Sequence, residues 1–538
     1  MLPPPSRCLL ALLGTTLLAG VAGAQAPPPG FVGPFEPGLR WLHPSGLASP
    51  WIPTEAGFGA GGELVWAATG DGTLSLRLLA STAAGAVLEP EAEDSASSTA
   101  SWVLGARAAD DPSRLFGLVQ YPEPDAFHRR TVVVRHDALG GGAVLDPVWS
   151  HAFDFTTNGP AELAVSASGE AAVAAALFPG AGLVRVERLA GADGALLGRL
   201  DLAAGALEAL ALSGSGEWVA LSLGTRILVL DPAGSVALDE LLPDSALDLA
   251  LDDEGLRLVV GLRGELRLYE RAPGTGWSLA ALHPGGADEV PTRVALSRDG
   301  SSYGASWWRV QGPDRLRHEL YRSEGHQRCN HLVQEGQPGG PQNAPVGIAF
   351  SADGQRAVVG AWGRGDSSPE VLLLELGQPT PLLAVDLPGS AMAVDLDATG
   401  TRVVVATKDL HANQLGTTGD VRLYDTGERD LELLEPPRLG GPLRVATHRP
   451  GASFGLFLIG RRLELPVTLP GIGGLLRLDR GERLTVLARP CDATGRADLE
   501  LSAAITTGVA LEGLSLQAAH RIGGQLELGR TLLTPVVR

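Results

Sequence analysis

The sequence has little of what covalent, metal or phosphate chemistry usually needs. Among 538 residues there are three cysteines, two methionines and a single lysine, Lys408. The net charge of −19 argues against an extended basic surface, so we expect no nucleic-acid partner and no attraction to anionic membrane surfaces. What the sequence has in abundance is glycine, with 71 residues, and short alternating apolar segments.

The N-terminal residues have the pattern of an export signal. A weakly positive start containing Arg7 precedes the apolar run "LLALLGTTLLAG", which is too short to cross a bilayer. Small residues follow, and we expect cleavage after Ala24. No later stretch is apolar enough for a membrane span. The segment therefore predicts a secreted protein, located outside the cell, in the periplasm or in the cell envelope.

Six windows of thirteen residues align without gaps and give the clearest structural signal. Each has alternating apolar residues, a polar stretch with glycine at the seventh position, and a second apolar run. Glycine adopts the left-handed conformation that ends a type I turn, so each window predicts a β-hairpin. The windows begin at Leu163, Leu210, Leu249, Val294, Ile348 and Val394, and their glycines are Gly169, Gly216, Gly255, Gly300, Gly354 and Gly400.

A further short strand recurs eight times, at a period of about 50 residues. Together with the hairpin and one more strand it gives four strands per repeat, which is the pattern of β-propeller blades. We therefore predict an all-β protein with an eight-bladed β-propeller over residues 57–435. The eight strands begin at Leu74, Val132, Val184, Ile227, Leu266, His318, Val371 and Val421.

The turns "SRDG" and "SADG" and strands such as "VRLYDT" resemble the broad propeller superfamily that includes WD-type, YVTN-type and quinoprotein-like repeats. The resemblance implies the fold. It implies no single activity, because that superfamily contains binding proteins and many unrelated enzymes.

The repeat stops after the eighth unit. From about residue 440 the chain consists of short alternating strands separated by Gly and Pro turns, which predicts a β-sandwich over residues 436–538. Its segments "RPGASFGLFLIG", "GGLLRLD" and "GLSLQAA" resemble the C-terminal sandwich of exported proteins from planctomycete-type bacteria. The predicted organisation is a signal peptide (1–24), a linker (25–56), the propeller (57–435) and the sandwich (436–538).

Three motifs that suggest a catalytic or binding site are better explained by strands and core packing. "GASFG" around Ser453 fits a hydrolase nucleophile motif, but an apolar strand follows where a helix is required. "GFGAGG" at 57–62 is likewise followed by a strand, so a dinucleotide site is not expected. The tryptophans Trp307, Trp308 and Trp362 are expected in the core between sheets.

The segment "EGHQRCNH" contains the best candidates for metal ligands. Cys329 and His331 lie two apart on a predicted outer strand and should share one face, with His326 in the preceding turn. Thiolate and imidazole are ligands of zinc and copper, although no fourth ligand is in view. Alternatively, Cys329 forms a disulfide with Cys491, since both remain after signal cleavage in a compartment where disulfides persist, or both are lone thiols.

No catalytic set of residues is recognisable, and we expect no cofactor. The leading hypothesis is a secreted, monomeric, non-catalytic propeller that binds a protein, a peptide or a glycan. One alternative is a propeller enzyme, such as a metal-dependent lactonase, a glycosidase or a quinoprotein-like dehydrogenase. Another is a cell-envelope component attached through the sandwich. A ring of inward-facing acidic, amide or histidine side chains would favour the enzyme.

Overall fold

The computed structural model describes most of the chain. The described residues are 39–44, 52–59, 64–69, 76–80, 87–88, 102–109, 114–122, 129–137, 147–157, 159–272, 274–309, 315–335, 343–364, 368–411, 416, 418–426, 431–433, 443–448, 452–469, 472–478, 485–492, 496–501, 514–522 and 525–533.

The fold is all-β. Apart from one 3-10 turn at Glu324–His326, the described residues contain no helix. None of their helical structure is long and apolar enough to cross a membrane. The chain divides into two compact units, whose main parts are Leu42–Leu79 with Val87–Leu423, and Tyr424–Arg538.

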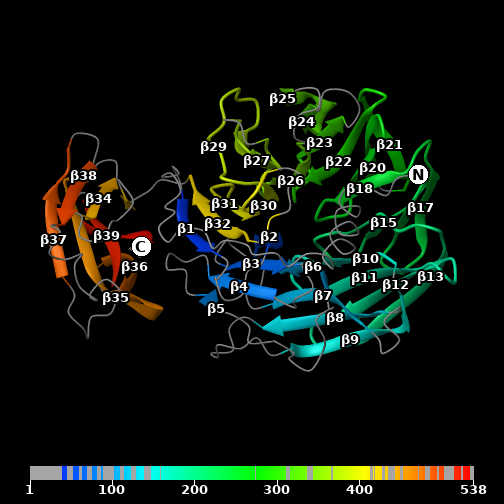
Figure 1. Ribbon diagram of the computed structural model, residues 1–538, viewed down its shortest axis with the longest axis horizontal. Coiled ribbons are helices and arrows are strands. Elements are labelled where there is room, and N and C mark those ends of the chain that lie inside the picture. The colour runs from blue at the N-terminus through cyan, green and yellow to red at the C-terminus, as the bar shows by residue number, and fades with distance from the viewer. Residues whose placement is uncertain are drawn as a thin grey trace, which may run out of the picture. The chain divides into compact units, whose positions relative to one another are not determined.

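Eight four-stranded sheets make up most of the part of the chain that the structure describes, and we number them in chain order (Figure 1). Sheet 1 contains β2 (Pro53–Phe58), β3 (Leu64–Thr69), β4 (Leu76–Ala80) and β5 (Val87–Leu88), and sheet 2 contains β6 (Trp102–Ala108), β7 (Arg114–Pro122), β8 (Arg129–Asp137) and β9 (Pro147–Thr156). Sheet 3 contains β10 (Ala161–Val165), β11 (Ala171–Phe178), β12 (Leu183–Ala190) and β13 (Leu196–Ala203), and sheet 4 contains β14 (Ala209–Leu212), β15 (Val219–Leu223), β16 (Arg226–Leu230) and β17 (Val236–Leu241).

Sheets 5 to 8 continue the same pattern until the last strand. Sheet 5 contains β18 (Ala246–Leu251), β19 (Arg257–Leu262), β20 (Glu265–Ala272) and β21 (Gly276–Pro284), and sheet 6 contains β22 (Glu289–Leu296), β23 (Ser302–Arg309), β24 (Arg315–Arg322) and β25 (Arg328–Glu335). Sheet 7 contains β26 (Pro345–Phe350), β27 (Arg356–Ala361), β28 (Val371–Glu375) and β29 (Leu383–Val385), and sheet 8 contains β30 (Ala391–Leu396), β31 (Arg402–Thr407), β32 (Asp420–Asp425) and β1 (Leu39–Pro44).

All eight recurring strands predicted from the sequence are third strands, from β4 in sheet 1 to β32 in sheet 8. The predicted linker, however, contains two strands: β1 (Leu39–Pro44) and β2 (Pro53–Phe58) begin within residues 25–56. β2 is the first strand of sheet 1, whereas β1 is the fourth strand of sheet 8. The segment outside the repeats carries no signal for a pairing between residues so far apart in the chain.

Each predicted hairpin turn is present, and its glycine is left-handed. The φ angles of these six glycines lie between 61° and 76°. The residue three positions earlier, a serine or an aspartate, is buried, and its side chain accepts backbone N–H groups just beyond the glycine. In sheet 5, for example, Asp252 Oδ1 accepts the N–H groups of Leu256 and Arg257 at 2.7 and 3.0 Å.

The first strands of successive sheets are neighbours. Each lies next to the first strand of the following sheet, and β30 of sheet 8 lies next to β2 of sheet 1. The hairpin turns are also joined from sheet to sheet by backbone hydrogen bonds. Four such bonds have N···O distances of 2.9 Å: Ala167 to Gly214, Ser215 to Asp253, Asp253 to Arg298 and Ala352 to Ala398.

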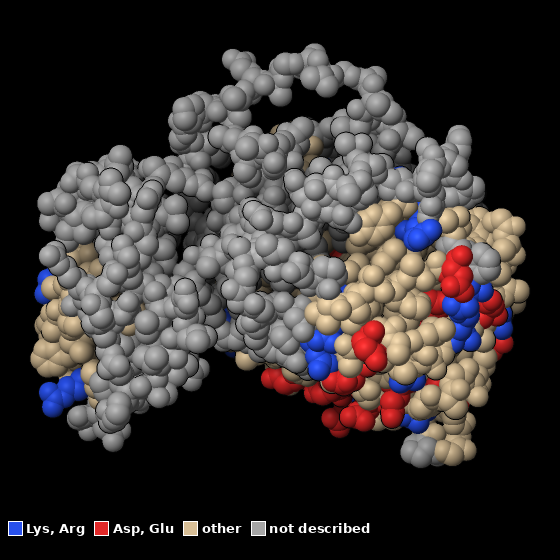
Figure 2. Space-filling model, turned by 90° about the horizontal axis from the view of Figure 1, so that it is seen from below, with Lys and Arg blue, Asp and Glu red and all other residues tan. Residues whose placement is uncertain are grey.

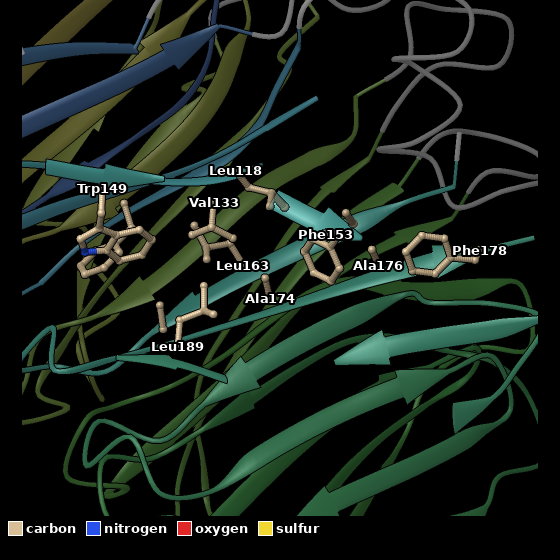
Figure 3. Packing of buried hydrophobic residues seen from close by; sticks show 12 residues of the cluster. Leu118, Val133, Trp149, Phe153, Leu163, Ala174, Ala176, Phe178 and Leu189 are labelled. Atoms are coloured by element: carbon tan, nitrogen blue, oxygen red, sulfur yellow. The ribbon is translucent and has the colours of Figure 1, made fainter. Parts of the chain in front are cut away.

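The hydrophobic core is divided into clusters that lie between neighbouring sheets. The cluster in Figure 3 combines Phe116, Val133 and Trp149 of sheet 2 with Leu163, Ala174 and other residues of sheet 3. Similar clusters join sheets 3 and 4, 4 and 5, 5 and 6, and 6 and 7. Burial of this apolar surface, at about 25 cal/mol per Å², therefore favours adhesion between sheets. Trp307, Trp308 and Trp362 are buried, which confirms their predicted place in the core.

Beyond sheet 8 the chain forms a three-stranded and a five-stranded sheet. One hydrophobic cluster, which includes Val445, Leu499, Phe457 and Leu516, contains residues from both sheets. The first sheet contains β33 (Glu432–Leu433), β34 (Leu443–His448) and β38 (Arg496–Leu501), and the second contains β35 (Phe454–Leu469), β36 (Ile472–Leu478), β37 (Thr485–Pro490), β39 (Leu514–Ile522) and β40 (Gln525–Leu533).

Candidate functional site

The predicted metal ligands lie around the turn that precedes β25. His326 ends the 3-10 turn, and Cys329 and His331 are on β25. The pairing of β24 with β25 shifts by one residue here, since Leu320 opposes Asn330 and Tyr321 opposes Arg328. Cys329 is the extra residue of this β-bulge, and a bulge changes which residues share a face.

The bulge directs Cys329 and His331 toward different neighbours. Cys329 packs with Leu332 against the hydrophobic cluster between sheets 6 and 7. His331 Nδ1 instead lies 3.0 Å from Glu319 Oε1 on β24. The structure does not bring His326, Cys329 and His331 together, and its described residues contain no group of three or more His, Cys, Asp or Glu side chains placed to hold a metal ion.

Glu319 is the centre of a polar cluster that sequence reasoning missed. The carboxylate is buried and lies 2.7 Å from Arg317 Nη1 and 2.8 Å from Arg328 Nη1. Tyr321 donates its hydroxyl to Glu319 at 2.9 Å. Burial alone would raise the pKa of Glu319, but Arg317 and the hydrogen bonds from Tyr321, Arg328 and His331 together lower it.

Aromatic side chains connect this cluster to sheet 5. The ring of His283 on β21 stacks on Tyr321, with centroids 4.0 Å apart, and its Nε2 lies 2.7 Å from the hydroxyl of Tyr303. Burial lowers the pKa of His283 and raises the pKa values of both tyrosines. Glu319 thus has three hydrogen-bonding partners and the ion pair with Arg317. Because His283 of sheet 5 contacts Tyr303 and Tyr321 of sheet 6, the cluster joins these two sheets.

Comparable polar contacts lie between the outer strands of other sheets. Glu187 of sheet 3 is buried between His151 of sheet 2 and Arg199, both at 2.8 Å. In sheet 5, the hydroxyl of Tyr269 donates to Glu240 of sheet 4 at 2.9 Å. On the face shown in Figure 2, acidic and basic side chains lie beside one another over the described residues. Part of the acidic charge on this face therefore lies close to basic side chains.

The first strands of several sheets contain acidic residues, the residue type that an active site of a propeller enzyme would use. Three of them hold the neighbouring strand: Asp248 accepts the N–H of Val294 at 2.8 Å, Asp395 that of Phe58 at 2.9 Å, and Glu55 that of Ala106 at 3.2 Å. Burial raises the pKa values of Asp248 and Asp395 to about 6. These contacts join neighbouring first strands, so each of the three carboxylates already accepts a hydrogen bond from the backbone.

The second and third strands are connected at the end opposite the hairpin turns, and these connections differ greatly in length. In sheets 4 and 5 they consist of residues 224–225 and 263–264 only. In sheets 7 and 8 they consist of residues 362–370 and 408–419. We call this end of the sheets the connection end and the other the turn end. The connection end is where the repeats differ most.

In the two longest connections a buried carboxylate lies near a half-buried histidine. Glu370 Oε2 accepts the N–H of Leu387 at 2.6 Å, and its Oε1 lies 3.7 Å from Nδ1 of His411 in the connection of sheet 8. The only lysine, Lys408, begins that connection, and burial lowers its pKa. Sequence reasoning did not select these residues. Two signals were available: the isolated lysine, and the longer spacing between hairpin and third strand in the last two repeats.

The remaining candidate residues, Ser453, Cys329 and Cys491, lie beside strands or against the hydrophobic core. The strand β35 begins directly after Ser453, whose hydroxyl lies 3.3 Å from the carbonyl of Arg521. The strand expected after Ser453 is therefore confirmed, as is the strand β3 after residues 57–62. Cys329 and Cys491 are both free thiols, and Cys491 packs against the core shared by the two C-terminal sheets. The structure does not pair them.

Comparisons with known proteins do not assign the chain to a family. No protein-family model matches the sequence, and no curated protein matches it significantly. The function is therefore inferred from the residues of this chain alone.

Proposed function

We propose that the eight sheets form an eight-bladed β-propeller of the WD/YVTN/quinoprotein-like type and that the two C-terminal sheets form a β-sandwich. The protein is secreted and binds a protein, peptide or glycan without catalysing a reaction. The binding surface is the connection end of sheets 7 and 8. The neighbouring first strands support the propeller, because they follow one another from β2 to β30 and return to β2.

The difference between the two ends of the sheets carries the functional proposal. At the turn end, a left-handed glycine and a serine or aspartate that caps the turn recur in sheets 3 to 8. At the connection end, sheets 4 and 5 have minimal links, whereas sheets 7 and 8 have residues 362–370 and 408–419. Loops on a rigid scaffold are where binding residues concentrate. The carboxylates of the first strands bind backbone N–H groups, which favours a binding role over an enzymatic one.

Two exposed leucines allow a matched test. Leu410 is in the connection of sheet 8 and is 40% exposed, while Leu256 follows the hairpin turn of sheet 5 and is 37% exposed. The tagged full chain is used to capture partners from the native culture, with Leu410→Ser and Leu256→Ser in parallel. Burial of a leucine side chain in an interface contributes about 1.5 kcal/mol, so Leu410→Ser should reduce capture roughly tenfold, while Leu256→Ser should leave it unchanged.

Two results would overturn this proposal. Unchanged capture by Leu410→Ser together with reduced capture by Leu256→Ser would place the binding surface at the turn end instead. Turnover of a lactone, glycoside or alcohol that disappears on changing Asp248 or Asp395 would make the protein an enzyme.

A further inference from the structure

Sheet 8 is assembled differently from the other seven. Sheets 1 to 7 each take four strands that follow one another in the chain. In sheet 8, the strands β30, β31 and β32 come from residues 391–425, but the fourth strand is β1 (Leu39–Pro44). Figure 1 shows β1 in blue beside the yellow β32. The next strand along the chain, β33, belongs to another sheet.

This arrangement gives β1 no local connection to the strand on which it docks. In sheets 3 and 4, for comparison, the fourth strand follows the third through residues 191–195 and 231–235. The covalent neighbour of β1 is instead β2, the first strand of sheet 1. Residues 45–52 link the two strands and have a maximal reach of about 30 Å when extended.

The edge of β32 needs a partner. Val421, Leu423 and Tyr424 are buried, so β32 is a core strand, and an open edge on such a strand exposes a row of unpaired N–H and C=O groups. Backbone pairing on that edge depends little on which chain supplies the strand. Such a strand can be exchanged between copies at low cost, because the same contacts form in both arrangements.

We propose that the edge of β32 accepts residues 39–44 of a second copy of this chain, which gives a strand-exchanged dimer alongside the monomer in which β1 docks on its own β32. This inference is independent of the proposed binding function. Own-chain docking benefits from an effective concentration on the order of millimolar. The monomer therefore dominates in dilute solution, and exchange occurs when sheet 8 forms or opens at high protein concentration.

The first test is refolding of the full chain, without its signal peptide, over a hundredfold range of concentration, followed by separation by size. The dimer fraction should rise at least tenfold across the range, and dimers should revert to monomers slowly after dilution. The matched variant is the double substitution Trp41→Pro and Leu42→Pro, which removes two consecutive N–H groups and so prevents strand pairing in either orientation. Dimers of equal amount in this variant would overturn the proposal.

A second test applies even if the proline variant does not fold. A protease site is inserted between Pro44 and Pro53, and the folded chain is cut there. The N-terminal fragment should remain bound, and a fluorescent peptide of residues 36–48 in excess should replace it saturably. A peptide carrying the two proline substitutions should not. Release of the fragment without uptake of the peptide, or equal uptake of both peptides, would contradict strand docking at β32.

Discussion

The two ends of the four-stranded sheets are built in different ways. At the turn end, backbone hydrogen bonds join one hairpin turn to the next, and arginines of one sheet donate to the turn glycine carbonyl of the following sheet, as Arg356 does to Gly400 at 3.1 Å. At the connection end, the contacts between sheets involve titratable side chains, including Asp248, Glu370 and His411. The comparison indicates that a repeated set of backbone and arginine contacts joins the sheets at the turn end, whereas the contacts at the connection end differ from sheet to sheet.

The largest expected effect comes from the turn glycines. Gly255 has φ +61°, and a Cβ there would lie 2.4 Å from the ring of Trp218. Gly255→Ala should therefore lower the free energy of unfolding by about 2–4 kcal/mol, from backbone strain plus overpacking. Gly234 is the matched control, since its φ is +78° and nothing lies within 4 Å of the place that a Cβ would occupy. Gly234→Ala should cost only about 1 kcal/mol.

Denaturant unfolding followed by tryptophan fluorescence measures this difference. All ten tryptophans precede residue 363, so none of them belongs to the two C-terminal sheets. Equal costs for the two alanine variants would show that packing between successive turns contributes little.

A pH-dependent contribution is expected at the connection end. Burial raises the pKa of Asp248 to about 6 from an ordinary value of 3.8. A carboxyl group whose pKa is higher in the folded state stabilises the fold when protonated, and this stabilisation is lost as the pH rises through about 6. Asp248→Asn has no such titration. The unfolding free energy of Asp248→Asn minus that of the parent should therefore increase by about 2–3 kcal/mol between pH 4 and pH 7.5.

The measurement is the difference in unfolding free energy between parent and Asp248→Asn at several pH values. A difference that does not change with pH would mean that Asp248 ionises normally in the folded protein.

The capping residues of the hairpin turns should have a smaller effect. Ser297 is buried; its hydroxyl oxygen accepts the N–H of Ser302 at 2.9 Å and its hydroxyl group donates to Asp299 at 2.7 Å. Ser297→Ala leaves a buried N–H without this partner and should cost about 1–2 kcal/mol. Ser297→Thr, which keeps the hydroxyl, should recover part of the loss. A cost below about 0.5 kcal/mol would show that the side chain is dispensable there.

The smallest effect is expected for exposed residues at the connection end. Leu410→Ser should change the free energy of unfolding by no more than about 0.5 kcal/mol, as is usual for exposed positions. Chemical denaturation of this variant checks that any loss of partner capture reflects binding. A cost of several kcal/mol would mean that the connection of sheet 8 is part of the core.

The sequence predicted local features of the fold well and long-range ones poorly. The six turn glycines and the eight third strands follow from short periodic patterns, because each hairpin is specified by adjacent residues. The docking of β1 on β32 was not predicted, since nothing in residues 39–44 repeats or refers to residues 420–425. Cys329 and His331 were expected on one face from strict alternation, and a one-residue bulge separated them. The contact between Glu370 and His411 depends on the folding of two non-repeating connections, so no local pattern could predict it.

Hydrogen exchange at the turn amides tests most directly whether the turn end holds the sheets together. The N–H groups of Ala167, Ser215, Asp253 and Ala352 lie in turns, which ordinarily exchange quickly, but each donates to the next sheet at 2.9 Å. We predict that these four amides exchange only through global unfolding, with protection that falls in step with denaturant, while amides of the connection 408–411 exchange faster through local opening. Turn amides that exchange as fast as those of residues 408–411 would contradict this role of the turn end.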